Sequence, residues 1–204
     1  MRLLDCYLPI FKLASLVAQQ PEDFADYDAF RKLCITRLEQ AVHEAEQHEM
    51  SDFERDQAFF AVVVWLDETV LCSALLFAQN WRTDLLQRKY FQTSIGGETF
   101  FVKLSQLKEE HKQARCVFLF CLQSGFNGKY SAAQERSALS SLIKQQRHLC
   151  LPKEWLLWPN DAQLTQVSFR KRSLASSKYS FTLAVLGLAV MYATLVLLQI
   201  LYFS

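Results

Sequence analysis

The scarcity of residues that interrupt helices constrains this fold more than any other feature of the sequence. No proline occurs between Glu22 and Leu151, and four of the five glycines fall in two short clusters, Gly96-Gly97 and Gly125/Gly128. Long segments without helix breakers, in which apolar residues recur at helical spacing, are typical of α-helices. The sequence therefore predicts an all-α domain.

Periodicity and capping residues predict where the helices lie. We expect a first helix at about residues 8–19, with Pro9 in its opening turn, and a second helix after Pro21. A capping box at Ser51–Glu54 predicts a third helix that runs towards Ala78. Shorter helices are expected near residues 84–93, 98–110, 114–124 and 131–147. The predicted apolar face of the first helix consists of Ile10, Leu13, Ala14 and Val17. That of the second helix consists of Tyr27, Phe30, Cys34, Leu38, Ala41 and Ala45.

The C-terminal segment is apolar over a length that suits a bilayer. Residues 179–204 contain no charged side chain, and a helix of this length spans roughly 35 Å, enough for the ~30 Å hydrocarbon core. We therefore predict a transmembrane helix at residues 179–203, with a buried core helix as the alternative. The basic residues that precede it, with none after it, are Arg170, Lys171, Arg172 and Lys178.

The charge distribution predicts the membrane topology and divides the chain into three parts. Positive charge stays on the cytoplasmic side, so we expect a cytoplasmic helical domain (residues 1–151), a basic linker (152–178) and a C-terminus across the membrane, with no signal peptide. Without that basic run the chain has 18 basic and 21 acidic residues, which argues against nucleic acid as a partner. Orientation in the membrane and contact with anionic lipids explain the run better.

Neither the cysteines nor the histidines form a metal-binding pattern. The six cysteines include no C-x-x-C pair and mostly lie in apolar runs, so we expect reduced, buried side chains. His43 and His48 are five residues apart, about 140° around a helix, and therefore diverge. We expect no metal and no cofactor.

Asp67 and Glu68 interrupt the most apolar helix of the chain. Neither has a basic residue three or four positions away, and an unpaired buried carboxylate is costly. The pair must meet a base from elsewhere, cap a neighbouring helix, or face a wet cleft that receives a partner's basic or donor group. Adjacent side chains on a helix point ~100° apart, a poor geometry for an acid and a base acting on one bond, so catalysis is the weakest alternative.

The glycine clusters lie in two short motifs that follow the acidic pair. Gly96-Gly97-Glu98 precedes a predicted helix, and the second cluster forms a tight connection with aromatic side chains at Phe126 and Tyr130. With the acidic pair they give three motifs in order: Trp65-x-Asp67-Glu68, Gly96-Gly97-Glu98-x-Phe100-Phe101 and Leu122-x-x-Gly125-Phe126-x-Gly128-x-Tyr130. The order of these motifs before the C-terminal anchor closely resembles that of the DotU/IcmH/TssL family.

This resemblance implies a structural, non-enzymatic inner-membrane component of a bacterial secretion machine, either type VI or the related Dot/Icm type IVB system. It implies a cytoplasmic domain of two packed helix bundles and one C-terminal span. The implied partners are an IcmF/TssM-type inner-membrane protein, baseplate components in a type VI system, and further copies of the chain. An accessory protein would be needed for any peptidoglycan anchoring.

The resemblance also implies roles for the motif residues. By position, Asp67 and Glu68 match the family's acidic pair at the cleft between the bundles. The glycine motifs, including Glu98, Phe126 and Tyr130, match its signature turns, whose implied role is architectural. Two other protein classes remain as alternatives: a tail-anchored helical regulator of the Bcl-2 type, and a membrane-bound hydrolase that uses Asp67 and Glu68.

Overall fold

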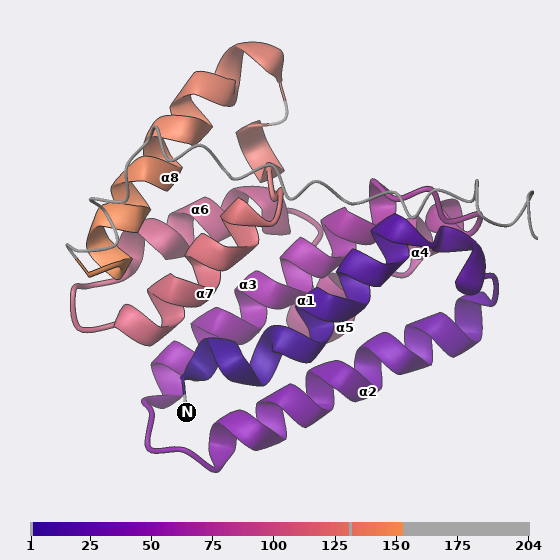
Figure 1. The fold of residues 1–204 in the computed structure, drawn as a ribbon, viewed down its shortest axis with the longest axis horizontal. Coiled ribbons are helices and arrows are strands. Elements are labelled where there is room, and N and C mark those ends of the chain that lie inside the picture. Colours follow the sequence, from indigo (N-terminus) through magenta and orange to yellow (C-terminus); the bar gives the residue numbers. More distant parts are fainter. Residues whose placement is uncertain (1, 131, 153–204) are drawn as a thin grey trace, which may run out of the picture. The chain divides into compact units, whose positions relative to one another are not determined.

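The computed structural model describes residues 2–130 and 132–152, which fold into α-helices and short 3₁₀ turns with no β-strand among them (Figure 1). The prediction of an all-α domain is confirmed. The helices are α1 (Leu3–Gln19), α2 (Tyr27–Glu46), α3 (Asp52–Leu71), α4 (Ala78–Thr83), α5 (Leu86–Phe91), α6 (Gly96–Gln106), α7 (Lys112–Gln123) and α8 (Arg136–Cys150). The 3₁₀ turns are η1 (Pro21–Asp23), η2 (Gly128–Tyr130) and η3 (Ala133–Glu135).

The predicted linker lies almost wholly outside the described residues, and the predicted transmembrane helix lies entirely outside them. Within residues 2–130 and 132–152, no helix is both long enough and apolar enough to cross a bilayer.

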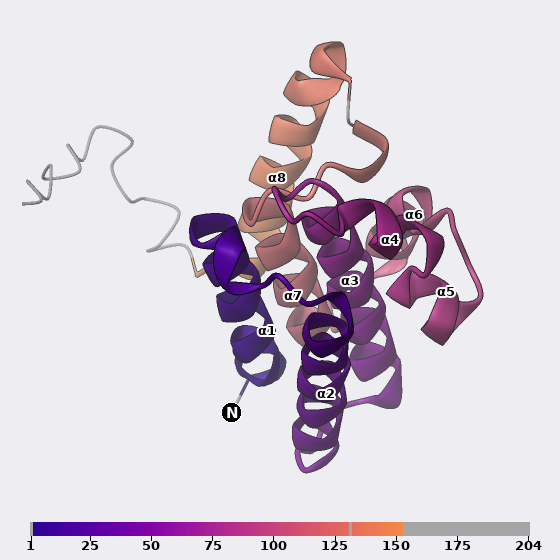
Figure 2. The ribbon, with the colours of Figure 1, turned by 90° about the vertical axis from the view of Figure 1, so that its right-hand side faces the viewer.

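Helix α3 is the centre of the domain. It packs against α1, α2, α4, α5, α6 and α7, and Figure 2 shows it between α1, α2 and α7 on one side and α4, α5 and α6 on the other. Its residues from Phe60 to Asp67 are buried in an unbroken run. A helix that is enclosed on all sides needs apolar residues around its whole circumference, which explains why this segment has almost the composition of a membrane span.

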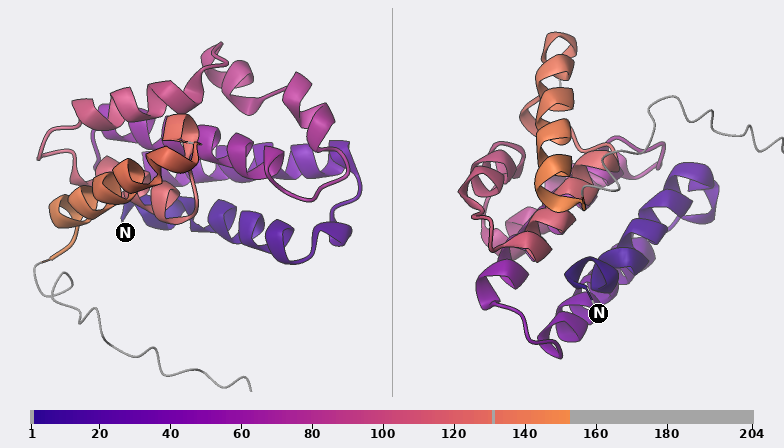
Figure 3. Two further views of the ribbon diagram at one scale, coloured as in Figure 1. Left: turned by 90° about the horizontal axis from the view of Figure 1, so that it is seen from above. Right: turned by 60° about the vertical axis from the view of Figure 1, so that its left-hand side comes forward.

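The apolar faces predicted for the first two helices form their buried surfaces. All four residues named for α1 are buried, as are Phe30, Cys34, Leu38, Ala41 and Ala45 of α2. Tyr27 is half-buried, and its ring contacts those of Phe77 and Trp81 edge-on. Helix α8 packs on α7, on the side of the domain away from α2 (Figure 3).

Helix α1 begins earlier than predicted. It starts at Leu3, so Pro9 lies inside the helix instead of in its opening turn. Proline removes one backbone hydrogen bond at that point, but the added turn buries Leu3, Cys6 and Tyr7 in the core. The Asp5 carboxylate also accepts a hydrogen bond from the Arg2 backbone N–H at 2.8 Å, which helps to start the helix there.

The predicted extension of the third helix to Ala78 is wrong, because α3 ends at Leu71 and α4 begins at Ala78. The Ser73 hydroxyl donates to the Val70 carbonyl and accepts from the Leu75 N–H. A serine that bonds the nearby backbone in this way competes with the helical pattern.

Two further helix starts also differ from the prediction. Helix α6 includes Gly96 and Gly97 in its first turn, so the glycines do not precede it. Helix α8 begins at Arg136, after a 3₁₀ turn, whereas the sequence predicted a helix that begins near residue 131. No side chain caps α8 at Glu135, so local sequence alone did not place this boundary.

Candidate functional site

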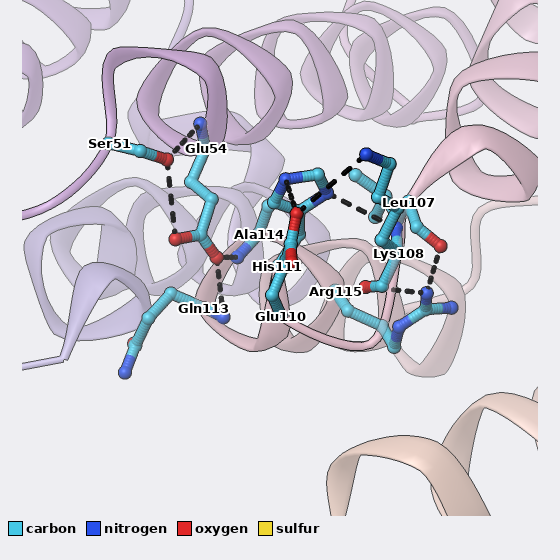
Figure 4. Close-up of polar contacts among 9 residues, drawn as sticks. All are labelled: Ser51, Glu54, Leu107, Lys108, Glu110, His111, Gln113, Ala114 and Arg115. Carbon is cyan, nitrogen blue, oxygen red and sulfur yellow. Dashed lines mark hydrogen bonds and ion pairs between the residues drawn. The ribbon is translucent and has the colours of Figure 1, made fainter.

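Three carboxylates of α3 cap segments that follow it in the chain. Helices α5, α6 and α7 lack a capping side chain at their own N-cap residue, although the first N–H groups of every helix need acceptors. For α7 the acceptor is Glu54, whose Oε1 receives hydrogen bonds from the Gln113 N–H at 3.0 Å and the Ala114 N–H at 3.2 Å (Figure 4). Tertiary packing therefore supplies caps that the local sequence does not.

Asp67 caps α5 from a fully buried position. Its side chain has no exposed surface, and its Oδ1 accepts from Trp81 Nε1 at 2.7 Å and from the Leu86 N–H at 3.0 Å. Its Oδ2 accepts from the Gln87 N–H at 2.8 Å. Burial raises the pKa of Asp67, and these donors act against that rise. The sequence left three alternatives for this residue: pairing with a base, capping a neighbouring helix, or facing a wet cleft. The structure shows the second.

Gln87 extends this network from α5 to α6. While its backbone N–H donates to Asp67, its side-chain Oε1 accepts from the Gly96 N–H at 2.9 Å in the first turn of α6. A Cβ at Gly96 would lie 2.3 Å from that oxygen and 2.7 Å from Val64 Cγ2. Position 96 therefore requires glycine for close approach. Sequence reasoning missed Gln87, because nothing near it in the chain marks it as a cap for a helix nine residues later.

Glu68 holds the second glycine motif. Its two carboxylate oxygens accept from the Asn127 N–H at 2.7 Å and from the Gly128 N–H at 2.9 Å. Its side chain is half-buried, and burial raises its pKa while the two backbone donors oppose the rise. Asp67 thus links α3 to α5, and Glu68 links α3 to the start of η2.

The two glycine motifs also touch each other. A Cβ on Gly97 would lie 3.3 Å from Gly128 Cα, and one on Gly128 would lie 2.8 Å from the Gly97 carbonyl oxygen. The Phe126 ring contacts Phe100 with centroids 4.2 Å apart, and the Tyr130 ring contacts Phe101 at 4.8 Å. The structure therefore brings all three sequence motifs together in one cluster.

The remaining predicted site residues have different locations. Glu98 is exposed in the first turn of α6 and forms no ion pair with another described residue. The membrane-orienting residues Arg170, Lys171, Arg172 and Lys178 lie outside the described part. Within that part, no group of three potential metal ligands is present. The polar contacts of the cluster run mainly from backbone N–H groups to carboxylate and amide oxygens, which suits it to fixing loops in place.

The cysteines differ in part from the prediction. Three of the six are buried, but Cys116 and Cys150 are half-buried and Cys72 is exposed. The expectation of buried cysteine side chains is therefore wrong for these three.

Comparison with known proteins identifies the family. The family model described as "Type VI secretion system protein DotU" matches residues 2–203, nearly the whole chain. The chain belongs to the DotU family. No protein with a curated description matches it.

Two solved structures of TssL share the fold of this DotU family member. The cytoplasmic domain of TssL from Acinetobacter baumannii superposes with a TM-score of 0.63 at 25% identity, covering 73% of this chain and 96% of that one. The crystal structure of SciP/TssL from enteroaggregative Escherichia coli 042 gives 0.59 at 22% identity, covering 71% and 86%. Of the two secretion systems left open by the sequence, the description of the matched family names type VI.

Proposed function

We propose that this chain is a non-enzymatic component of the inner-membrane complex of a type VI secretion system. In this proposal the cytoplasmic domain, built as two packed helix bundles, docks baseplate components, and the chain assembles with an IcmF/TssM-type protein and with further copies of itself. The observation that carries the proposal is the family match over residues 2–203, which includes the apolar C-terminal segment. The matched family and structures give no support to a Bcl-2-type regulator or a hydrolase.

The proposed topology has a direct test. A reporter fused after Ser204 is expected to be active in the periplasm, and one fused before Met1 in the cytoplasm, because the basic residues at 170–178 stay on the cytoplasmic side. Replacing those four residues by Gln should reduce the asymmetry between the two reporters. Cytoplasmic activity of both fusions to the unaltered chain would contradict the proposed span.

We also propose that the acidic pair serves partner binding by positioning the turn at residues 125–130. Glu68 fixes the backbone of this turn, while Asn127 and Lys129 within it are exposed. Asp67 is buried and so would act on a partner only through the segments that it caps. The exposed turn, held in one conformation by Glu68, would then present the contact surface.

The Glu68→Gln variant is expected to weaken capture of a partner in detergent-solubilised pull-downs by about tenfold, with only a small change in melting temperature. An amide keeps one acceptor oxygen, but its NH₂ group faces the second backbone donor, and water can reach this half-buried site. The probes are the IcmF/TssM-type protein and a baseplate component from the same system. Glu39→Gln, an exposed change on α2, is the matched control.

A second variant keeps this test independent of the fold. Lys129 is exposed and lies over the rings of Phe101 and Tyr130, so Lys129→Gln alters the surface of the turn without removing a backbone cap. Weaker capture by both variants, with near-normal melting, supports the turn as the contact surface. Normal capture by both would leave the acidic pair with an internal role only.

A further inference from the structure

A pocket separate from the acidic pair lies where four helices meet. It has a volume of about 350 Å³ and is lined by side chains of α1, α2, α3 and α5. None of these side chains belongs to the three sequence motifs, so the pocket is distinct from the cluster described above. Its size suits a small molecule, and its lining indicates which kind.

Aromatic and aliphatic side chains form the walls of this pocket. Tyr7 of α1, Phe59 of α3 and Tyr90 of α5 contribute rings, and Val42 of α2 adds a branched apolar side chain. The rings of Phe59 and Tyr90 meet edge-on, with their centroids 5.1 Å apart. Lys89, which does not line the pocket, places its ammonium group 5.6 Å from the Tyr90 ring centroid. Aromatic rings attract cations, so the walls suit a positive group on an alkyl chain.

The two tyrosine hydroxyls at the pocket lack hydrogen-bond partners among the described residues. The Tyr90 hydroxyl oxygen is a buried atom with no partner there. Tyr7 is only 1% exposed, and its hydroxyl likewise bonds to no described residue. Buried polar groups nearly always have partners, and a phenol oxygen can accept a hydrogen bond from an N–H group. The pocket therefore offers two acceptors to a ligand that carries N–H donors.

Three exposed carboxylates line the same pocket: Glu39 and Glu46 of α2 and Asp56 of α3. Glu39 and Asp56 form no ion pair with another described residue. Because seven residues separate Glu39 from Glu46, these two lie two helical turns and roughly 10 Å apart along one face of α2. This spacing suits a ligand with a positive group at each end.

The basic residues at the pocket leave much of this negative charge uncompensated. Arg55 donates to the Met50 carbonyl at 2.8 Å and to the Asp52 carboxylate, so its guanidinium group already has partners. His43 lies 3.9 Å from Glu46 on an exposed part of α2, and a histidine carries charge only when it is protonated. The pocket thus has an excess of negative charge at pH 7, which favours a cation.

We propose that this pocket binds a short aliphatic diamine. One ammonium group donates to the hydroxyl oxygens of Tyr7 and Tyr90, and the alkyl chain packs on Phe59. The second ammonium group pairs with Glu46, two turns along α2 from Glu39. The site lies outside the turn at residues 125–130, so this binding is independent of the partner contact proposed for that turn.

The test uses the full chain in nonionic detergent, with its tyrosine rings labelled with ¹³C, titrated with 1,4-diaminobutane at pH 7 and constant ionic strength. We expect the NMR signals of Tyr7 and Tyr90, assigned by their Phe variants, to shift saturably with a Kd on the order of 1 mM. Tyr27 and Tyr130 do not line the pocket, so their signals should stay in place.

Two related molecules test which features of the ligand matter. With one charge fewer, 1-aminobutane should bind about fivefold more weakly, because it cannot pair with both ends of the acidic face. The neutral 1,4-butanediol has the same chain length and should cause no saturable shift. The proposal is overturned if the diol shifts Tyr7 and Tyr90 as much as the diamine does, or if Tyr27 and Tyr130 shift equally.

Variants locate the binding in this pocket. The double variant Glu39→Gln, Asp56→Asn should bind the diamine about tenfold more weakly and melt like wild type, because both side chains are exposed and unpaired. The matched control is Asp28→Asn, Glu44→Gln, which removes two exposed charges of α2 that do not line the pocket, and it should bind like wild type. Equal affinity of the two double variants would contradict the proposal.

Tyr90→Phe gives a measurement that does not depend on charge. Removing a buried hydroxyl that has no partner should leave the melting temperature at or above that of wild type. The same change removes an acceptor for the ammonium group, so the affinity for the diamine should fall about threefold. Wild-type affinity of this variant would remove the tyrosine hydroxyl from the proposed site and overturn the assignment.

Discussion

The Asp67→Asn variant is expected to melt well below the wild-type chain, with partner binding lost as a consequence. The Asp67 carboxylate accepts three hydrogen bonds in a site without solvent exposure. Asparagine has one acceptor oxygen, so its NH₂ group must face one of the three N–H donors. Leaving buried donors unpaired costs about 1–3 kcal/mol each, so we expect a loss of about 3 kcal/mol, or roughly 6–12 °C in melting temperature.

The matched control for this change is Asp28→Asn. Asp28 is exposed in the first turn of α2, where a carboxylate contributes only about 0.3–1 kcal/mol through the helix dipole. Thermal melting and partner capture should be measured on the same protein samples. If Asp67→Asn melted like wild type and yet lost capture, Asp67 would have to contact the partner directly, contrary to its buried geometry.

The pH dependence of stability gives a second measurement on the acidic pair. Burial raises the folded-state pKa of Asp67 above its ordinary value of 3.8, and that of Glu68 above 4.5. A raised folded-state pKa means that the folded state binds more protons than the unfolded state. These two groups therefore stabilise the fold fully at pH values below their unfolded-state pKa, and that stabilisation is lost as the pH rises through the folded-state pKa. The Asp67→Asn variant should therefore show a shallower fall in stability with rising pH than wild type.

Replacing Gly128 by Val is the second change expected to have a large effect. Gly128 has φ +51°, in the left-handed region, where residues with a Cβ are disfavoured by about 1–2 kcal/mol. A Cβ there would also lie 2.8 Å from the Gly97 carbonyl oxygen, 2.9 Å from Phe101 Cε2 and 3.0 Å from Phe126 Cε1. Together, strain and overpacking should destabilise the domain by about 3 kcal/mol or more.

Gly125→Ala separates backbone strain from crowding. Gly125 also has positive φ, +95°, but no atom lies within 4 Å of a Cβ built there. This variant should therefore lose only the strain contribution and melt between wild type and Gly128→Val. Because Gly128 also donates its backbone N–H to Glu68, chemical denaturation of both variants should be paired with capture of the partner. Equal stability of Gly128→Val and wild type would rule out the close approach of the two glycine motifs.

Local sequence signals placed much of the helical framework. The spacing of apolar residues predicted the buried faces of α1 and α2, since helical periodicity depends only on neighbours within two or three turns. Ser51 was also predicted as a cap, and its hydroxyl accepts from the Glu54 N–H at 3.2 Å. The Glu54 side chain, however, is also used by α7, a role that no local motif reveals.

By itself, then, the sequence determined the all-α class and the main helices, because helix breakers and apolar periodicity are local properties. It also showed that Asp67 and Glu68 need hydrogen-bond or charge partners, because an unpaired buried carboxylate is costly wherever the chain folds. Only the tertiary structure decided which groups donate hydrogen bonds to these two carboxylates. The donors to Asp67 lie 14–20 residues away, and those to Glu68 lie 59–60 residues away. Caps over such separations depend on how the helices pack, and the same packing set the role of Gln87 and the contact between Gly97 and Gly128.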